Sequence, residues 1–133
     1  MSRYEEMFAL IGRLGPQMRE GYAAGHAALG AARAEPPSAA TISALGGSAI
    51  GGSLAEALWR DSARVPVSVN RAATLPGWVG EGDLVLPVSY SGATAETLAA
   101  ARIALERGAD VIAVTAGEPL AALVLDGGGR VVR

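Results

Sequence analysis

Several residue types are missing or scarce in this sequence, and each gap excludes a kind of chemistry. The chain contains no cysteine, no lysine and one histidine. Without cysteine it has no disulfide framework, no thiolate nucleophile and no Cys-based metal site. Without lysine it forms no Schiff base and has no lysine-bearing phosphate loop. The single histidine adds too few ligands for a catalytic metal, so we expect no metal site.

Charge and hydropathy limit the partners that the protein can have. The formal net charge is −2 over 133 residues, whereas nucleic-acid binding needs clustered positive charge. Glu5 and Glu6 do not fit a signal peptide, and no apolar run approaches the roughly 18 residues of a membrane span. The length suits one domain of about 100–200 residues. We expect a cytoplasmic protein that binds neither nucleic acid nor membranes.

The first third of the chain has the periodicity of helix. Apolar residues recur there at steps of three and four, namely Met7, Leu10, Ile11, Leu14, Met18, Tyr22 and Leu29. Gly15-Pro16 interrupts this pattern, and proline suits the first turn of a helix better than its middle. We predict two helices or one kinked helix ending near Ala34. They form a helical leader (residues 1–37) that packs on the domain or on a partner.

From residue 38 onward, short apolar segments alternate with helical ones. Strand character is found at residues 41–45, 65–69, 84–88, 111–115 and 130–133, and helical character at 54–59, 94–107 and 118–123. Pro87 should end or bulge its strand, because strand interiors exclude proline. This alternation predicts an α/β domain at residues 38–133 with a parallel sheet covered on both faces. Because the last strand has no covering helix after it, we expect this domain to be incomplete at its C-terminal end or covered by a partner.

Two polar segments follow strands, at the edge where open parallel α/β sheets bind ligands. The first, Gly46–Ser53, has four glycines and precedes a helix. Glycines let the backbone approach a ligand closely, and a helix start offers free N–H groups and partial positive charge. A tight turn without any ligand explains this first segment equally well.

The second segment, Ser89–Thr94, is called the serine loop below. It places the hydroxyls of Ser89, Ser91 and Thr94 before a helix. Hydroxyls and free backbone N–H groups can hold a phosphate without a cationic side chain. Capping by Ser91 or Thr94, with Glu96 complementing the helix dipole, is the alternative, but it accounts for one hydroxyl rather than three. We predict an anion site at the serine loop.

Residues 88–98 resemble the signature of sugar isomerase (SIS) domains. The order of Gly46–Gly52, Arg71–Val79 and the serine loop is similar to the N-terminal half of bifunctional phosphoglucose/phosphomannose isomerases. The resemblance implies a three-layer α/β fold with a five-stranded parallel sheet of flavodoxin-like type. It also implies a phosphorylated hexose as ligand, no cofactor, and either a homodimer or a second SIS domain as partner.

The resemblance further implies which residues hold the ligand. The sugar phosphate is assigned to the loop residues Ser89, Ser91, Gly92 and Thr94, and the sugar or its phosphate to Gly47 and Ser48. Ala49 stands where the family commonly has glycine, and Ala93 where it commonly has asparagine. These two departures leave the fine specificity open.

Arg71, after the second strand, has three interpretations. It is a surface arginine, a residue that shapes the sugar site, or the reader of a 2′-phosphate in an NADP-binding module. The dinucleotide fingerprint needs glycine at the middle position between Gly46 and Gly51, where this chain has Ser48. The NADP-binding alternative therefore ranks below the sugar-phosphate one.

Isomerisation of an aldose to a ketose moves a proton between C1 and C2 through an enediol and needs a base. His26, Glu56 and Glu96 each have a structural explanation, so the catalytic residues stay unidentified. The predicted function is the phosphosugar-binding part of an isomerase that converts glucose 6-phosphate or mannose 6-phosphate to fructose 6-phosphate. The alternative is a non-catalytic module that senses a phosphosugar or forms a dimer.

Overall fold

The structure, a computed structural model, describes residues 2–29 and 35–133. The chain divides into two compact units, Met1–Arg33 and Ala34–Arg133. The first unit is helical, and the second contains a β-sheet with helices.

The N-terminal unit consists of α1 (Arg3–Gly12) and α2 (Leu14–Leu29). Ser2 begins α1 with a capping box, in which its Oγ accepts from the Glu5 N–H and its own N–H donates to Glu5 Oε2 at 2.6 Å. The two helices separate at Arg13, so Gly15-Pro16 falls in the first turn of α2, where proline is tolerated. The prediction of two helices is confirmed, and its expected end near Ala34 lies outside the described residues.

The predicted apolar stripe of these two helices is exposed. Met7, Leu10, Ile11, Leu14 and Met18 are each 51–59% exposed. Within the described part of α1, no residue is buried. The side chain of Leu29, the last residue of the predicted stripe, lies outside the description. A contiguous apolar surface of this kind is typical of an interaction site.

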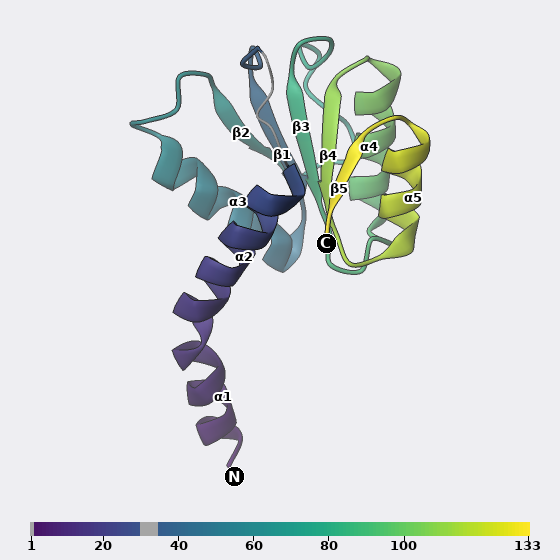
Figure 1. Cartoon of the computed structure of the whole chain (residues 1–133). Helices are drawn as coiled ribbons and strands as arrows, with labels where there is room; N and C mark the ends of the chain where they lie inside the picture. The colour runs from purple at the N-terminus through teal and green to yellow at the C-terminus, as the bar shows by residue number, and fades with distance from the viewer. Residues whose placement is uncertain (1, 30–34) are drawn as a thin grey trace. The chain divides into compact units, whose positions relative to one another are not determined.

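In the described part of the second unit, five strands form one parallel sheet in the order β2-β1-β3-β4-β5 (Figure 1). They are β1 (Ala40–Ala44), β2 (Val67–Asn70), β3 (Leu84–Val88), β4 (Asp110–Val114) and β5 (Arg130–Val132). This is the flavodoxin-like order, in which β1 and β3 are neighbours and the chain leaves them in opposite directions. The predicted α/β fold with a five-stranded parallel sheet is confirmed.

Three helices connect these strands, namely α3 (Gly46–Trp59), α4 (Ala95–Glu106) and α5 (Glu118–Asp126). Helix α3 lies on one side of the sheet, and α4 and α5 lie on the other (Figure 1). The core beneath α4 and α5 is built from small residues, because fully buried alanines of α4 meet Val85 and Leu120. Alanine brings the helix backbone close to the sheet, which suits a chain with a single phenylalanine.

Helix α3 begins earlier than the sequence predicted, because the glycines of Gly46–Ser53 lie inside its first two turns instead of in a loop. One of these glycines, Gly52, is needed for packing. A Cβ on Gly52 would lie 2.9 Å from Ile42 Cγ2 and 3.5 Å from both Val69 methyl carbons. Gly52 therefore lets α3 approach the sheet closely, which is a structural role.

Pro87 lies inside β3, the central strand of the sheet. Pairing of β3 with β1 continues through Ser43↔Pro87 to Ala44↔Val88, so the expected end of the ladder is wrong on that side. On the β4 side, the register passes from Val85↔Val111 directly to Val88↔Val114, so the expected interruption is confirmed there. The physical reason is the side of β3 toward which the N–H of residue 87 would point. The N–H of Ser89, two residues on, donates to β4, so the missing N–H of Pro87 affects only that side.

Candidate functional site

The two predicted polar segments begin side by side at the carboxyl edge of the sheet. Ala44 and Val88 are register partners on the adjacent strands β1 and β3, so the residues that follow them start at the same level. From there α3 and α4 leave toward opposite faces of the sheet. A crevice at this switch point is where ligands bind in open α/β sheets.

Ser89 organises the serine loop from inside. It is 3% exposed, and its Oγ accepts from the Gly92 N–H at 3.1 Å and lies 3.0 Å from Thr94 Oγ1. Gly92 has a φ of +67°, a conformation that favours glycine. The buried hydroxyl of Ser89 thus closes the loop on itself.

The other two predicted hydroxyls are more accessible. Ser91 is exposed, and its Oγ accepts from the Ala93 N–H at 3.2 Å. Thr94 is half-buried and is the N-cap residue of α4. Both hydroxyls lie where a ligand in front of the helix could accept a hydrogen bond from them.

The start of α4 is open. Among the described side chains, none forms a capping hydrogen bond there, so capping by Ser91 or Thr94 is not observed. The first-turn N–H groups, which have no partner inside the helix, face the serine loop with the positive end of the helix dipole. Open N–H groups beside hydroxyls form an anion-binding arrangement.

The start of α3 is open as well. Its N-cap is Leu45, and no described side chain caps it. Gly46 has a φ of +53°, Gly47 is exposed and Ser48 is half-buried. The predicted sugar-binding residues Gly47 and Ser48 therefore lie in the first turn of a second uncapped helix.

A cavity of about 260 Å³ joins the two segments. Its polar rim is formed by Ser48, Tyr90, Thr115 and Arg133. One wall is apolar and consists of a register row across three strands, Val88, Val114 and Val132. The structure thus brings Ser48 and Tyr90 to one cavity. The predicted phosphate-binding residues are not among the residues that line it, namely Ser89, Ser91, Gly92 and Thr94.

Thr115 and Arg133 were not singled out in the sequence. Thr115 directly follows β4, and its hydroxyl accepts from the Gly117 N–H at 3.0 Å. Arg133 is ion-paired with Glu118 at 2.8 Å. A hydroxyl residue directly after a strand was the available signal for Thr115, since the same signal identified Ser89. The spacing in the sequence gives no such signal for Arg133.

Arg71 lies elsewhere on the same edge, after β2. Its Nη2 donates to Ser53 Oγ in the second turn of α3, and its side chain is exposed. The structure therefore attaches Arg71 to the helix that carries Gly47 and Ser48, but does not place it in the lining of the 260 Å³ cavity. Its guanidinium keeps free N–H donors, because guanidinium has five.

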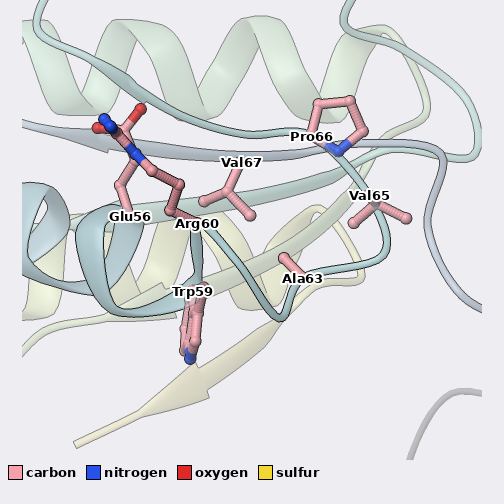
Figure 2. Close-up of a pocket in the computed structure, with 7 residues that line it drawn as sticks. All are labelled: Glu56, Trp59, Arg60, Ala63, Val65, Pro66 and Val67. Carbon is pink, nitrogen blue, oxygen red and sulfur yellow. The ribbon is translucent and has the colours of Figure 1, made fainter.

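The three acid–base candidates do not line this cavity either. Glu56 lies near the end of α3, in a different hollow of about 180 Å³ with Trp59 and Arg60 beside the start of β2 (Figure 2). Glu96 is exposed in the first turn of α4. His26 belongs to the N-terminal unit, where it is exposed and its ring centroid lies 6.3 Å from that of Tyr22.

Metal ligands and membrane-spanning helices were both predicted to be absent. Across residues 2–29 and 35–133, no cluster of three or more His, Cys, Asp or Glu side chains could hold a metal ion. In the same ranges, no helix combines the length and apolarity that crossing a membrane requires.

Comparison with known proteins shows which family the chain matches. Residues 41–123 match the family model described as SIS domain. The bifunctional phosphoglucose/phosphomannose isomerase of Caldicellulosiruptor bescii is 40% identical over 114 residues, which are 86% of this chain and 34% of that protein. The chain thus spans about a third of the length of this relative.

Solved structures share the fold. A candidate phosphosugar isomerase from Bacillus subtilis matches with a TM-score of 0.64 and 30% identity, over 76% of this chain and 32% of that one. The Vibrio vulnificus NanR protein complexed with ManNAc-6P matches with a TM-score of 0.57 and 26% identity, over 66% of this chain and 36% of that one.

Proposed function

The chain belongs to the SIS domain family, and on this premise we propose that the carboxyl edge of its sheet binds a phosphorylated hexose. The observation that carries the proposal is the uncapped start of α4 behind a loop with three hydroxyls. First-turn N–H groups and the hydroxyls of Ser91 and Thr94 donate to the phosphate oxygens in this proposal. Ser89 and Gly92 hold the loop in the shape that directs those donors.

The sugar itself is proposed to contact the start of α3. Gly47 offers exposed backbone, and Ser48 lines the cavity that also contains Tyr90 of the serine loop. Arg71 is fixed to the same helix through Ser53 and supports the outer side of the sugar site. Because the cavity has apolar walls and few polar groups, these few groups would orient the ligand.

We further propose that the domain serves an isomerase that converts glucose 6-phosphate or mannose 6-phosphate to fructose 6-phosphate. The support is the 40% identity to a phosphoglucose/phosphomannose isomerase. Such a reaction needs a base at C1 and C2 and a group that opens the ring. Since His26, Glu56 and Glu96 do not line the cavity, those groups come from a second SIS domain or a partner subunit in this proposal.

The second candidate function is a phosphosugar-sensing module without catalysis. It is favoured by the likeness to the NanR protein complexed with ManNAc-6P. In either function the exposed apolar surface of the leader packs on the domain or on a partner. A dimer would meet this requirement, and we retain a cytoplasmic location as part of the proposal.

Ligand-induced thermal stabilisation tests the binding proposal, because a ligand of the folded state raises the thermal midpoint. Glucose 6-phosphate or fructose 6-phosphate should raise it, whereas glucose, which lacks the phosphate, and NADP should not. The double variant S89A/S91A should lose this shift, measured from its own ligand-free midpoint. The exposed Ser62 provides a matched control, since S62A removes a hydroxyl near the other end of the strands. An unchanged shift in S89A/S91A would place the phosphate elsewhere.

Turnover tests whether the catalytic groups lie within this chain. An isomerase assay that measures the conversion of fructose 6-phosphate to glucose 6-phosphate should detect no turnover by this chain, although the chain binds the sugar phosphate. Turnover by this chain alone would contradict the proposal that its catalytic groups come from another domain or subunit.

A further inference from the structure

The turn between β4 and α5, Thr115–Gly117, meets the serine loop backbone to backbone. A Cβ on Gly92 would lie 2.6 Å from the carbonyl oxygen of Gly117. A Cβ on Gly117 would overlap the Ser91 carbonyl group and lie 2.7 Å from the Gly92 nitrogen. Both positions are thus too close for any side chain, and the obstacle in each case is backbone.

Hydrogen bonds hold the turn in this position. The Ser89 N–H donates to the Val114 carbonyl at 3.1 Å, and the Ala116 N–H donates to the Tyr90 carbonyl at 3.3 Å. Thr115, which is 4% exposed, accepts from the Gly117 N–H at 3.0 Å and fixes the turn internally. The turn is therefore a rigid support under the serine loop.

The two facing glycines are required for different reasons. Gly92 has a φ of +67°, so its backbone conformation alone favours glycine. Gly117 has φ −93° and ψ 139°, which any residue adopts. The backbone conformation gives no reason for glycine at position 117. The reason is the space that the serine loop occupies.

We propose that Gly117 is a positioning residue for the phosphate site. Its missing side chain lets the Ser91–Gly92 peptide settle against the β4–α5 turn, which directs Ser91, Thr94 and the α4 N–H groups toward one point. This inference rests on the proposed function, because it assumes that the serine loop holds the phosphate. A methyl group at position 117 would push the loop outward and misalign its donors.

Gly117→Ala tests the proposal, with Gly77→Ala as the matched control. Gly77 lies in an exposed loop, and no described atom lies within 4 Å of a Cβ placed there. Calorimetric titration with glucose 6-phosphate should show an affinity loss of about tenfold or more in G117A, because the loss of one hydrogen bond to a charged phosphate costs about tenfold in affinity or more. G77A should bind like the unaltered chain. Amide NMR should show shifts at Gly92 and Ala93 in G117A but not in G77A.

Each result decides the proposal. Weaker binding together with the amide shifts, in a G117A variant that unfolds cooperatively, supports it. Unaltered affinity in folded G117A overturns it and leaves the proposed function standing. If the unaltered chain binds neither glucose 6-phosphate nor fructose 6-phosphate, the proposed function fails and this inference fails with it. If G117A does not fold, Thr115→Val decides, since it loses the bond to the Gly117 N–H without adding atoms. Unaltered affinity and unaltered Gly92 and Ala93 amides in T115V overturn the proposal.

Discussion

The hydroxyls of Ser89 and Thr94 lie 3.0 Å apart and join the first residue of the serine loop to the last. Because Ser89 Oγ also accepts from the Gly92 N–H, the loop is closed by its own hydrogen bonds before any ligand arrives. A loop that is ordered in advance loses less conformational entropy on binding. The serine loop therefore has a buried half, Ser89 and Gly92, and a more accessible half, Ser91 and Thr94.

Ser89→Ala should lower the free energy of unfolding by about 1–2 kcal/mol, since a buried hydroxyl with two hydrogen bonds is lost. The loss stays moderate because the Gly92 N–H keeps the Ser89 carbonyl as an acceptor at 3.2 Å. Urea denaturation measures this change. Ser91→Ala is the control, and because Ser91 is exposed it should change the stability by less than about 0.5 kcal/mol. Equal losses in both variants would contradict the division of the loop into two halves.

Adjacent glycines of α3 should respond in opposite directions to alanine. Gly52→Ala should lower the free energy of unfolding by about 1–3 kcal/mol, because its Cβ would press on Ile42 and overpack the core. Gly51→Ala should raise it by about 0.5–1 kcal/mol, since alanine is the better helix former and no described atom lies near the new Cβ. Chemical denaturation of the two variants measures both values. A stabilising G52A would mean that α3 lies farther from the sheet.

Thr97→Val should leave the stability unchanged or raise it by up to about 1 kcal/mol, because the hydroxyl it removes is buried and unpaired. Thr97 is fully buried in the first turn of α4, and its Oγ1 has no hydrogen-bond partner among the described residues. The thermal midpoint measures the effect. Thr41→Val provides the contrast, since Thr41 is also buried but its Oγ1 lies 3.3 Å from Ser68 Oγ. A loss in T97V that matches the loss in T41V would show that Thr97 has an acceptor or donor after all.

Arg71→Gln should weaken glucose 6-phosphate binding by up to about fivefold, since an exposed charge contributes roughly 0.2–1 kcal/mol. Its stability should stay near that of the unaltered chain, because the side chain is exposed. Titrations at low and high salt measure the effect, which should shrink as salt screens the charge. Arg64→Gln, an equally exposed change ahead of β2, should leave the affinity unaltered. The same loss of affinity in both variants would show that Arg71 acts only through the net charge of the domain and not through its position.

The fold was predictable because its strands and helices repeat one simple alternation. Segments 41–45 and 84–88 differ from β1 and β3 by at most one residue at each end. The prediction failed where local residue preference and packing disagree. Glycine disfavours helix, yet the contact of Gly52 with Ile42 and Val69 favours a close helix, so α3 extends through the glycines.

The serine loop could be proposed as a site from the sequence because Ser89, Ser91 and Thr94 lie within six residues of one another. The division of roles within it was not, because burial of Ser89 depends on strands that are far away in the chain. Gly117 was passed over for a related reason. Its partner, Ser91, is 26 residues earlier. A glycine that is required because the backbone of a distant segment lies against it has no local sequence pattern.

Pro87 leaves a gap in the hydrogen bonds between β3 and β4, which is called the seam below. One ladder hydrogen bond is missing there, although β3 and β4 stay paired on both sides of it, at Val85↔Val111 and at Val88↔Val114. Regions with fewer hydrogen bonds open first in local unfolding. The serine loop follows β3 and the Thr115–Gly117 turn follows β4, so they lie on the two sides of this seam, at the carboxyl ends of the strands. An opening of the seam would separate them. If the proposed function holds, the affinity for phosphate and the local opening of the sheet therefore depend on the same pair of strands.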